Sequence, residues 1–468
     1  MLSGRLHIVL VPGFAGFDAL GQLEYYAGIT PLFQRWKKLR GRDDRDLAIH
    51  YFDNLPTAGV VTRAARLRSY LVKRIARGEF VRGDGIVLVG HSTGGLDIRR
   101  LLWELNKAPS QTYPVDGATA KGPFVRGSDV LRLIHKVVFL SVPQWGTNIA
   151  DWVRSHKFGR ELVVADLRVS FTASQVPLLE SLQQAIVNCA SKSTDIGVVG
   201  AIRDALAEAE ADTSNDATQI ANAQEANSEL QLWLRHIATD FHAIDDLASQ
   251  SPTADSERPA HFNAERRKEE TAFWGAAGME TRSYATVGAR PFRFAAGEPA
   301  PLWDLLNPLT YPELTARQRP SPKTDVVYDY AYRACAGGPF VHPNPHDLPA
   351  PRAFVVNAKT PDELELWDND GIVNTASMLW PDGNETRLVT ADHMDIVGHF
   401  KPVREASKDS LRKFQAYDLL ASDSGFEEVT FEKVWNEIFD FCVAGGRSSV
   451  RRQRRIPRHR TRQKVMVE

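Results

Sequence analysis

One serine of this sequence has the surroundings that covalent chemistry requires. It lies in the run GHSTGG (residues 90–95), between an apolar stretch at 86–89 and an apolar-faced segment at 96–105. A serine between a strand and a helix sits on a sharp turn, and flanking glycines let that turn approach its neighbours without Cβ clashes. The hydroxyl of Ser92 would then be exposed at a helix N-terminus as a nucleophile. The alternative is a glycine-rich helix start in which Ser92 is only a capping residue.

A serine hydroxyl needs a base, and the base needs a group that orients it. His393 follows the last strand-like segment at 385–391, and Asp370 lies in the segment LWDNDGI (366–372). The order serine, acid, histidine is the chain order of α/β hydrolases, in which the acid and the histidine follow late strands. The sequence therefore predicts Ser92 as nucleophile, His393 as base and Asp370 as acid. Asp368 and Asp392 are the rivals of Asp370.

The third requirement is a pair of backbone N–H groups for the negative charge that develops on the attacked oxygen. The segment HIVLVPGFAGF (7–17) predicts a strand followed by a glycine-rich turn. One donor is expected from that turn and the other from the residue after the nucleophile. These are the N–H groups of Phe14 and Thr93. Phosphate-binding glycine motifs are absent from the sequence.

The elements that would position these groups follow an alternating pattern over residues 1–151. Segments 60–76 and 96–105 have apolar residues at helical spacing. Runs with the length and composition of strands lie at 5–11, 46–53, 85–90 and 135–142. Strands that are apolar throughout are typical of a mostly parallel sheet with helices on both faces. We expect residues 1–151 to form the first part of an α/β core.

The rest of the chain is expected to form three further parts. Residues 152–279 predict a mainly helical cap or lid insertion. Residues 280–445 are expected to complete the core around an irregular insertion at 290–362, with strands at 280–287 and 385–391 and helices near 407–420 and 429–442. Residues 446–468 predict a flexible basic tail, because residues 447–468 carry nine of the 57 Lys and Arg and one of the 58 Asp and Glu.

One apolar stripe within the expected cap invites a functional interpretation. It recurs every three or four residues, as on one face of a helix: Leu230, Trp233, Leu234, Ile237, Phe241 and Ile244. The stripe either packs the core of the cap or forms a lid over the acyl site, with Trp233 touching the substrate.

Composition excludes several classes of protein. With 468 residues, 43% hydrophobic and 25% charged, the chain is neither disordered overall nor a coiled coil. Its apolar runs fall short of the roughly 18 residues of a membrane helix. Three widely spaced cysteines give neither a disulfide framework nor a metal motif. The first apolar run leads straight into a Pro-Gly turn, so we expect a cytoplasmic protein, or a secreted one if Met1 begins an engineered mature chain.

The motifs together resemble the bacterial true lipases of the α/β-hydrolase fold, above all the thermoalkalophilic Bacillus-type group. The similar segments keep the family's order: IVLVPGFAGF (8–17), GHSTGG (90–95), SVPQWGTNIAD (141–151), TYPEL (310–314), DNDGIVNTASM (368–378) and DHMDIVG (392–398). The resemblance implies an α/β-hydrolase fold with a helical cap. It assigns the same residues: Ser92, Asp370 and His393, with the oxyanion donors Phe14 and Thr93.

Departures from the family concern its metal sites and two histidines. Pro12 and Gln144 stand where the family has histidine. The histidines of the Bacillus-type zinc site are missing, Thr62 replaces one of its acids, and Asp246 is the only remnant. Asp395 matches one acid of the family's calcium site, but the second acid, a turn later, is absent. We therefore expect no metal.

The sequence predicts a serine carboxylester hydrolase, a lipase or esterase that needs no cofactor. Its expected partner is a small-molecule or lipid ester, with no stable protein partner implied. The basic tail could make weak contact with anionic lipid or nucleic acid. One alternative is an acyltransferase or phospholipase on the same triad. The other is a non-catalytic module that binds membrane or nucleic acid through its tail.

Overall fold

The computed structural model describes most of the two halves of the chain that flank the expected cap. The described residues are 4–14, 16, 19–20, 23–42, 46–115, 123–155, 242–248, 264–288, 326–336, 340, 350–357, 359–380, 386–400, 418–420 and 422–444. Within these ranges, no helix combines the length and the apolar character that crossing a membrane requires.

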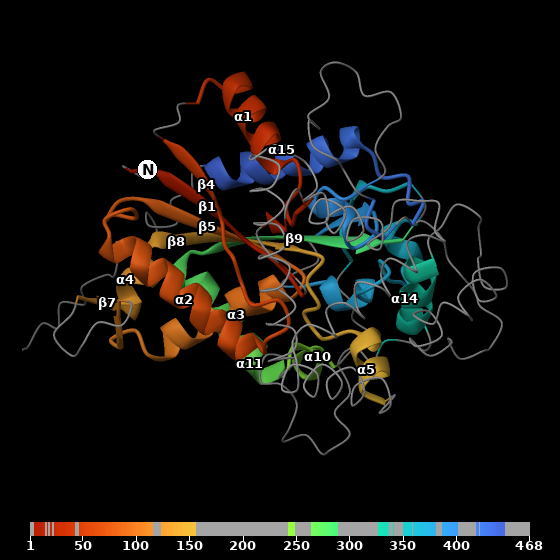
Figure 1. Ribbon diagram of the computed structural model, residues 1–468, viewed down its shortest axis with the longest axis horizontal. Coiled ribbons are helices and arrows are strands. Elements are labelled where there is room, and N and C mark those ends of the chain that lie inside the picture. Colours follow the sequence, from red (N-terminus) through yellow and green to blue (C-terminus); the bar gives the residue numbers. More distant parts are fainter. Residues whose placement is uncertain are drawn as a thin grey trace, which may run out of the picture.

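A seven-stranded sheet runs through the centre of the molecule, and all its strand pairs are parallel (Figure 1). Its order is β10-β11-β9-β8-β5-β1-β4. The strands are β1 (Leu6–Val11), β4 (Leu47–Tyr51), β5 (Gly85–His91), β8 (Ile134–Leu140), β9 (Glu280–Val287), β10 (Arg352–Val355) and β11 (Thr386–Thr390). Parallel strands end at the same edge, so the loops after β1, β5, β9 and β11 are neighbours in space.

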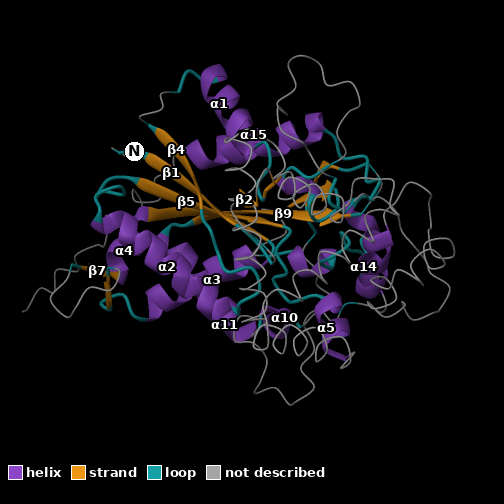
Figure 2. Ribbon diagram, in the orientation of Figure 1, coloured by secondary structure: helices purple, strands orange, loops and turns teal. Residues whose placement is uncertain are grey.

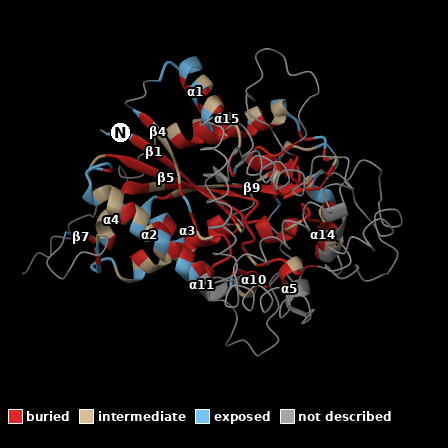
Figure 3. Ribbon diagram, viewed as in Figure 1, coloured by how far each residue is buried: buried red, intermediate tan, exposed pale blue. Residues whose placement is uncertain are grey.

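Helices cover both faces of this sheet (Figure 2). Helices α1 (Ile29–Leu39) and α15 (Glu428–Val443) pack on one face, where Phe33, Trp36 and Phe439 join the same apolar core. Helices α2 (Val60–Ala76), α3 (Thr93–Lys107), α4 (Gly127–Leu133) and α11 (Ala264–Ala277) lie on the other. The central strands β1 and β5 are buried along their whole length because they are covered from both sides (Figure 3).

Shorter elements lie around this core. Two antiparallel pairs join β2 (Ala19–Leu20) to β3 (Leu23–Glu24) and β6 (Thr112–Pro114) to β7 (Phe124–Arg126). The remaining helices are α5 (Asn148–Ser155), α10 (Ala243–Leu247) and α14 (Val326–Ala336), with single 3-10 turns at Pro361–Glu363, Thr375–Met378 and Asp395–Val397. Helix α10 packs beside α5, and Thr147 donates its N–H to the carbonyl of Leu247 at 2.9 Å.

This architecture is the α/β-hydrolase fold, and the predicted fold class is confirmed. Each of the six strands expected from the sequence is present within a residue or two of its predicted bounds, as are the helices expected at 60–76 and 429–442. The helix expected at 96–105 begins earlier, at Thr93. Edge strand β10 and helices α1, α4 and α14 were not predicted. The expected cap at 152–279, the helix near 407–420 and the tail at 446–468 lie wholly or mostly outside the described residues.

Candidate active site

Ser92 lies on a strained turn between the central strand β5 and helix α3. Its φ of 53° and ψ of −131° are an unfavourable combination for a residue with a side chain. The start of α3 lies so close to neighbouring backbone that only glycine fits there. A Cβ on Gly94 would lie 2.4 Å from the carbonyl oxygen of Val11. A Cβ on Gly95 would lie 2.3 Å from a methyl carbon of Val142. The two glycines therefore have the close-approach role that the sequence predicted.

His393 and Asp370 meet at the carboxyl edge of the sheet, where the predicted base follows β11. The Nδ1 atom of His393 lies 2.8 Å from Oδ2 of Asp370, and both side chains are buried. A carboxylate only accepts hydrogen bonds, so Nδ1 of the neutral imidazole carries the proton and Nε2 is the basic nitrogen. The backbone N–H of His393 also donates to the carbonyl of Asp370 at 3.0 Å.

The side chain of Asp370 accepts hydrogen bonds from four donors. Oδ1 accepts the N–H groups of Ile372 and Val373 at 3.0 and 2.8 Å, and Oδ2 accepts the Thr286 hydroxyl at 2.6 Å in addition to His393. Hydrogen bonds to the ionised form stabilise a buried carboxylate. These hydrogen bonds fix the side chain of Asp370 in the position from which it orients the imidazole of His393.

The two rival acids are engaged elsewhere. Both carboxylate oxygens of Asp368 bind Nζ of Lys359, at 2.6 and 2.7 Å. Asp392 accepts the N–H groups of Met394 and Asp395 and the hydroxyl of Ser422. Of the three candidates, Asp370 is the one that contacts the imidazole of His393.

The nucleophile and the base come from neighbouring loops. His91, the residue before Ser92, has its ring centroid 4.6 Å from that of His393. Ser92 and His393 are each 4% exposed. Among the hydrogen bonds of the described residues, none joins the Ser92 hydroxyl to His393. Such catalytic contacts are often long before a substrate binds and shorten in the reacting complex.

The predicted oxyanion loop lies directly against the nucleophile. A Cβ on Gly13, the residue before Phe14, would lie 2.6 Å from Cβ of Ser92. Thr93 is the first residue of α3, so its N–H is one of those without an acceptor inside the helix. A helix N-terminus also carries a partial positive charge. Both predicted donors are thus on backbone that borders Ser92.

A buried arginine fixes the carbonyls of this loop, and sequence reasoning did not find it. Nη2 of Arg63 donates to the carbonyls of Pro12 at 2.7 Å and Gly13 at 3.1 Å. Its Nε donates to Oδ2 of Asp97 on α3 at 3.0 Å. Arg63 and Asp97 are completely buried, and burial raises the pKa of Asp97 to about 6. The pair therefore ties the oxyanion loop to the helix that follows the nucleophile.

Among the described residues, three buried acids near His393 form a cluster that could hold a metal ion. Asp392, Asp395 and Asp418 each offer an oxygen, and these oxygens lie within 4.8 Å of one another. Burial raises the pKa of Asp392 to about 7 and that of Asp395 well above its usual range. An all-oxygen set of this kind suits a hard cation such as Ca²⁺. The family resemblance indicates Asp395 as a possible metal ligand, and the sequence indicates Asp392 only as a rival of Asp370. Asp418 is not indicated because it is distant from both in the chain.

Asp246, the remnant of the family's zinc site, has a structural role. Oδ2 of Asp246 accepts the N–H of Val60, the first residue of α2, at 2.7 Å. It thereby caps the positive end of that helix. Thr62 lies on the same helix. Of the apolar stripe at 230–244, Ile244 alone is described, and it is buried in α10. Trp233 lies outside the described residues.

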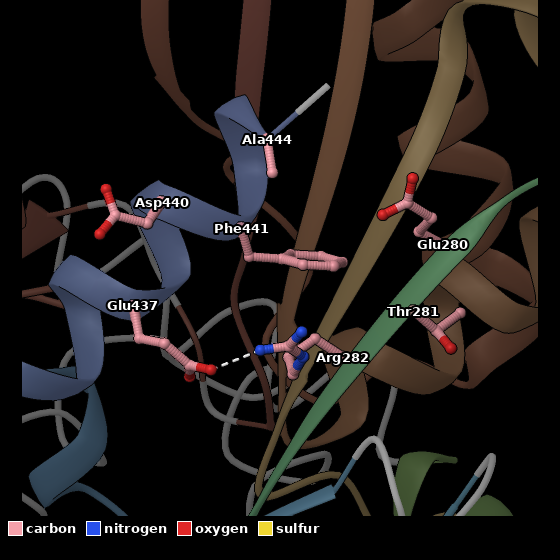
Figure 4. A pocket seen from close by; sticks show the side chains of 7 residues that line it. All are labelled: Glu280, Thr281, Arg282, Glu437, Asp440, Phe441 and Ala444. Atoms are coloured by element: carbon pink, nitrogen blue, oxygen red, sulfur yellow. Dashed lines mark hydrogen bonds and ion pairs between the residues drawn. The ribbon is translucent and has the colours of Figure 1, made fainter. Parts of the chain in front are cut away.

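A cavity of about 560 Å³ lies away from these groups, between the start of β9 and the end of α15 (Figure 4). Its acidic residues have basic partners: Glu437 pairs with Arg282, and Asp440 pairs with Arg40 at 2.6 Å. Because the described triad residues do not line it, this cavity is not the candidate active site.

Comparisons with known proteins give similarities to solved structures only. No protein-family model matches the chain, and a search of curated proteins gives no match. Lipase 1 from Pelosinus fermentans is 18% identical over 94% of this chain and 99% of its own, with a TM-score of 0.40. The Staphylococcus hyicus lipase is 13% identical over 94% and 95%, with a TM-score of 0.42. A metagenomic carboxyl esterase is 12% identical over 94% and 77%, with a TM-score of 0.35. The similar structures are thus bacterial lipases and esterases at low identity.

Proposed function

We propose that this protein is a serine carboxylester hydrolase. One observation carries the proposal: His393 is held in one tautomer by Asp370 at 2.8 Å, and its ring lies 4.6 Å from that of His91, the residue before a serine on a positive-φ turn between strand and helix. Strain of 1–3 kcal/mol or so at such a residue persists where the surrounding structure imposes it, typically at functional sites.

The mechanism follows from the donors and acceptors around Ser92. Nε2 of His393 takes the proton of the Ser92 hydroxyl while Oγ attacks the ester carbonyl. The imidazolium is stabilised by Asp370, and the tetrahedral oxyanion accepts the N–H groups of Phe14 and Thr93. His393 then protonates the departing alcohol, which leaves an acyl group on Ser92. Water, deprotonated by the same nitrogen, releases the acid and restores the enzyme.

A lipid or small-molecule ester is the proposed substrate, and the expected cap at 152–279 would supply the wall for its acyl chain. Each methylene buried there contributes about 0.8 kcal/mol to binding. Turnover should therefore rise from acetyl to medium-chain esters. An acyltransferase or phospholipase would use the same triad and differ in acceptor or substrate, so product analysis with and without added alcohol separates these functions.

The test is covalent labelling with a fluorophosphonate. We expect wild-type protein to gain one adduct on Ser92, identified by mass spectrometry, and to hydrolyse p-nitrophenyl esters. Ser92→Ala is the matched control and should lose both properties. Labelling without hydrolysis of any ester would point to another acyl-transfer reaction. Failure of the folded wild type to react would support the non-catalytic binding module instead.

Within the bacterial lipases, we propose a relationship to the thermoalkalophilic Bacillus-type group. The order of the six motifs supports it, whereas the missing zinc ligands set this chain apart. If the cluster of Asp392, Asp395 and Asp418 holds a cation, its carboxylates would neutralise the ion's charge and the ion would stiffen the loop that carries His393.

The basic tail is proposed to provide a weak electrostatic contact with anionic lipid. Its charge, without hydrophobic periodicity, supports this role. Deleting residues 447–468 should leave ester turnover intact and reduce salt-sensitive adsorption to phosphatidylserine vesicles. Equal adsorption by full-length and truncated protein would contradict the proposal.

A further inference from the structure

A chain of hydrogen bonds connects the oxyanion loop to the backbone of His393. The N–H of Gly13 lies 2.9 Å from the hydroxyl of Tyr25. That hydroxyl lies 2.6 Å from Nδ1 of His91, and Nε2 of His91 lies 2.9 Å from the carbonyl oxygen of His393. The side chains of Tyr25 and His91 are buried. The chain therefore spans three loops that come from distant parts of the sequence.

Each hydrogen bond in this chain has one possible direction. The carbonyl of His393 can only accept, so Nε2 of His91 carries a proton and donates. Nδ1 of the neutral ring is then an acceptor, and the hydroxyl of Tyr25 donates to it. The same hydroxyl accepts the N–H of Gly13. Burial lowers the pKa of His91 well below its usual value, which keeps the ring neutral.

We propose that Tyr25 and His91 are positioning residues that hold the oxyanion donor of Phe14 and the imidazole of His393 in one fixed relation to Ser92. This inference rests on the proposed function. Gly13 immediately precedes Phe14, and His91 immediately precedes Ser92. Tyr25 and His91 thus link the loops that carry the oxyanion donor, the nucleophile and the base, and this role requires no contact with the substrate.

The energetic reason for such a link is that catalytic groups tolerate little displacement. A misplacement of about 1 Å can cost about a hundredfold in rate. A second anchor on the loop is Arg63, which binds the carbonyls of Pro12 and Gly13, whereas Tyr25 binds the N–H of Gly13. Removing the hydroxyl of Tyr25 should leave the loop attached by its carbonyls but able to rotate its N–H groups away from Ser92.

The first experiment compares Tyr25→Phe with Tyr284→Phe. Tyr284 is a matched control because it is similarly buried and its hydroxyl donates to Glu437 on α15, which is not part of the hydrogen-bond chain from Gly13 to His393. Both variants should lose a similar amount of melting temperature. Tyr25→Phe should lower kcat for a p-nitrophenyl ester by about tenfold with KM within about twofold. Tyr284→Phe should leave kcat within about twofold.

The second experiment breaks the two hydrogen bonds of the His91 side chain one at a time. His91→Gln can still donate from its side-chain amide toward the carbonyl of His393 but offers no acceptor in place of Nδ1, whereas His91→Asn offers that acceptor and loses the donor. Each variant should lower kcat. The double variant Tyr25→Phe/His91→Gln should lose no more kcat than the worse of its two single variants, because both substitutions interrupt the same chain of hydrogen bonds. His91→Gln also keeps the test decisive if Tyr25→Phe fails to fold.

The outcomes separate this proposal from the proposed function. If wild-type protein neither reacts with fluorophosphonate nor hydrolyses esters, the proposed function fails. If the wild type is active and the Tyr25 and His91 variants lose stability but keep kcat within about twofold, the two residues are structural and the positioning role is overturned. Strict additivity of their kcat losses in the double variant would also overturn it.

Discussion

Oδ2 of Asp370 is shared by two donors, Nδ1 of His393 at 2.8 Å and the hydroxyl of Thr286 at 2.6 Å. The other oxygen accepts two backbone N–H groups of the same loop. A carboxylate bound in this way cannot rotate, so the imidazole that it orients is held in one plane. Thr286 in turn bonds to the hydroxyl of Ser141 at the end of β8. The acid is thus fixed to the sheet itself.

The first prediction concerns the choice of acid. Asp370→Asn should lower kcat by a factor on the order of 10⁴, because an amide N–H facing Nδ1 favours the wrong tautomer of His393. Asp368→Asn is the control: it weakens the contact with Lys359 and should change kcat little while lowering the melting temperature. Steady-state kinetics on one ester measures both. An inactive Asp368→Asn beside a fully active Asp370→Asn would show that the acid is misassigned.

The second prediction concerns the anchor of the oxyanion loop. Arg63→Met leaves the carboxylate of Asp97 buried and unpaired, which should lower the free energy of unfolding by about 3–5 kcal/mol. Arg66→Met, one turn of α2 away, removes an exposed pair with Asp53 and should cost about 1 kcal/mol or less. Urea unfolding of the two variants gives the comparison. Similar losses would mean that the buried pair contributes no more than a surface one.

Much of the sheet could be predicted because its central strands are mostly apolar. Strands β1, β5 and β8 are covered on both faces, so their burial is visible as runs of four consecutive apolar residues, mostly Val, Ile and Leu. The elbow serine was predictable because its strand, glycines and helix are adjacent in the chain. Strand β10 is short and mostly exposed or half-buried, at the sheet edge, so its composition carries no such signal.

The contacts that sequence reasoning missed join residues far apart in the chain. Arg63 and Asp97 are each unremarkable as single residues, and their burial depends on how α2 packs on α3. Tyr25 and His91 meet only because β1 and β5 are neighbouring strands. Asp395 could be identified through the resemblance to the lipase family, whereas Asp418 joins it only through the fold of the C-terminal third. Long-range pairing of polar groups leaves no local pattern.

The third prediction is an acid sensitivity at the opposite end of the sheet. Nδ1 of His7 on β1 lies 2.9 Å from Nε2 of His50 on β4. Burial and the neighbouring His7 lower the pKa of His50 to about 4. An unfolded histidine titrates near 6.5, so below that pH the unfolded chain binds a proton that the folded protein refuses. Stability is therefore full above about pH 6.5 and falls as the pH is lowered toward 4.

Melting temperatures between pH 7 and 4 measure this effect. His50→Asn should flatten the decline relative to wild type, because the group that must charge on unfolding is gone. If His50→Asn shows the full wild-type slope, the acid sensitivity arises from other groups.

The last prediction tests the acid cluster of Asp392, Asp395 and Asp418. Three buried carboxylates whose oxygens lie within 4.8 Å repel one another unless protons or a cation neutralise them. At pH 8 we expect Ca²⁺ to raise the melting temperature above its value in EDTA, by a free energy of about 2.7 kcal/mol once its concentration is a hundred times Kd. Asp395→Asn should abolish the response, whereas Asp362→Asn, at an exposed acid, should preserve it. Because Asp392 and Asp395 flank His393 in the chain, chelation should also lower kcat. Identical melting curves in Ca²⁺ and EDTA would instead uphold the expectation from sequence that no metal is bound, and the carboxylates would then be neutralised by protons.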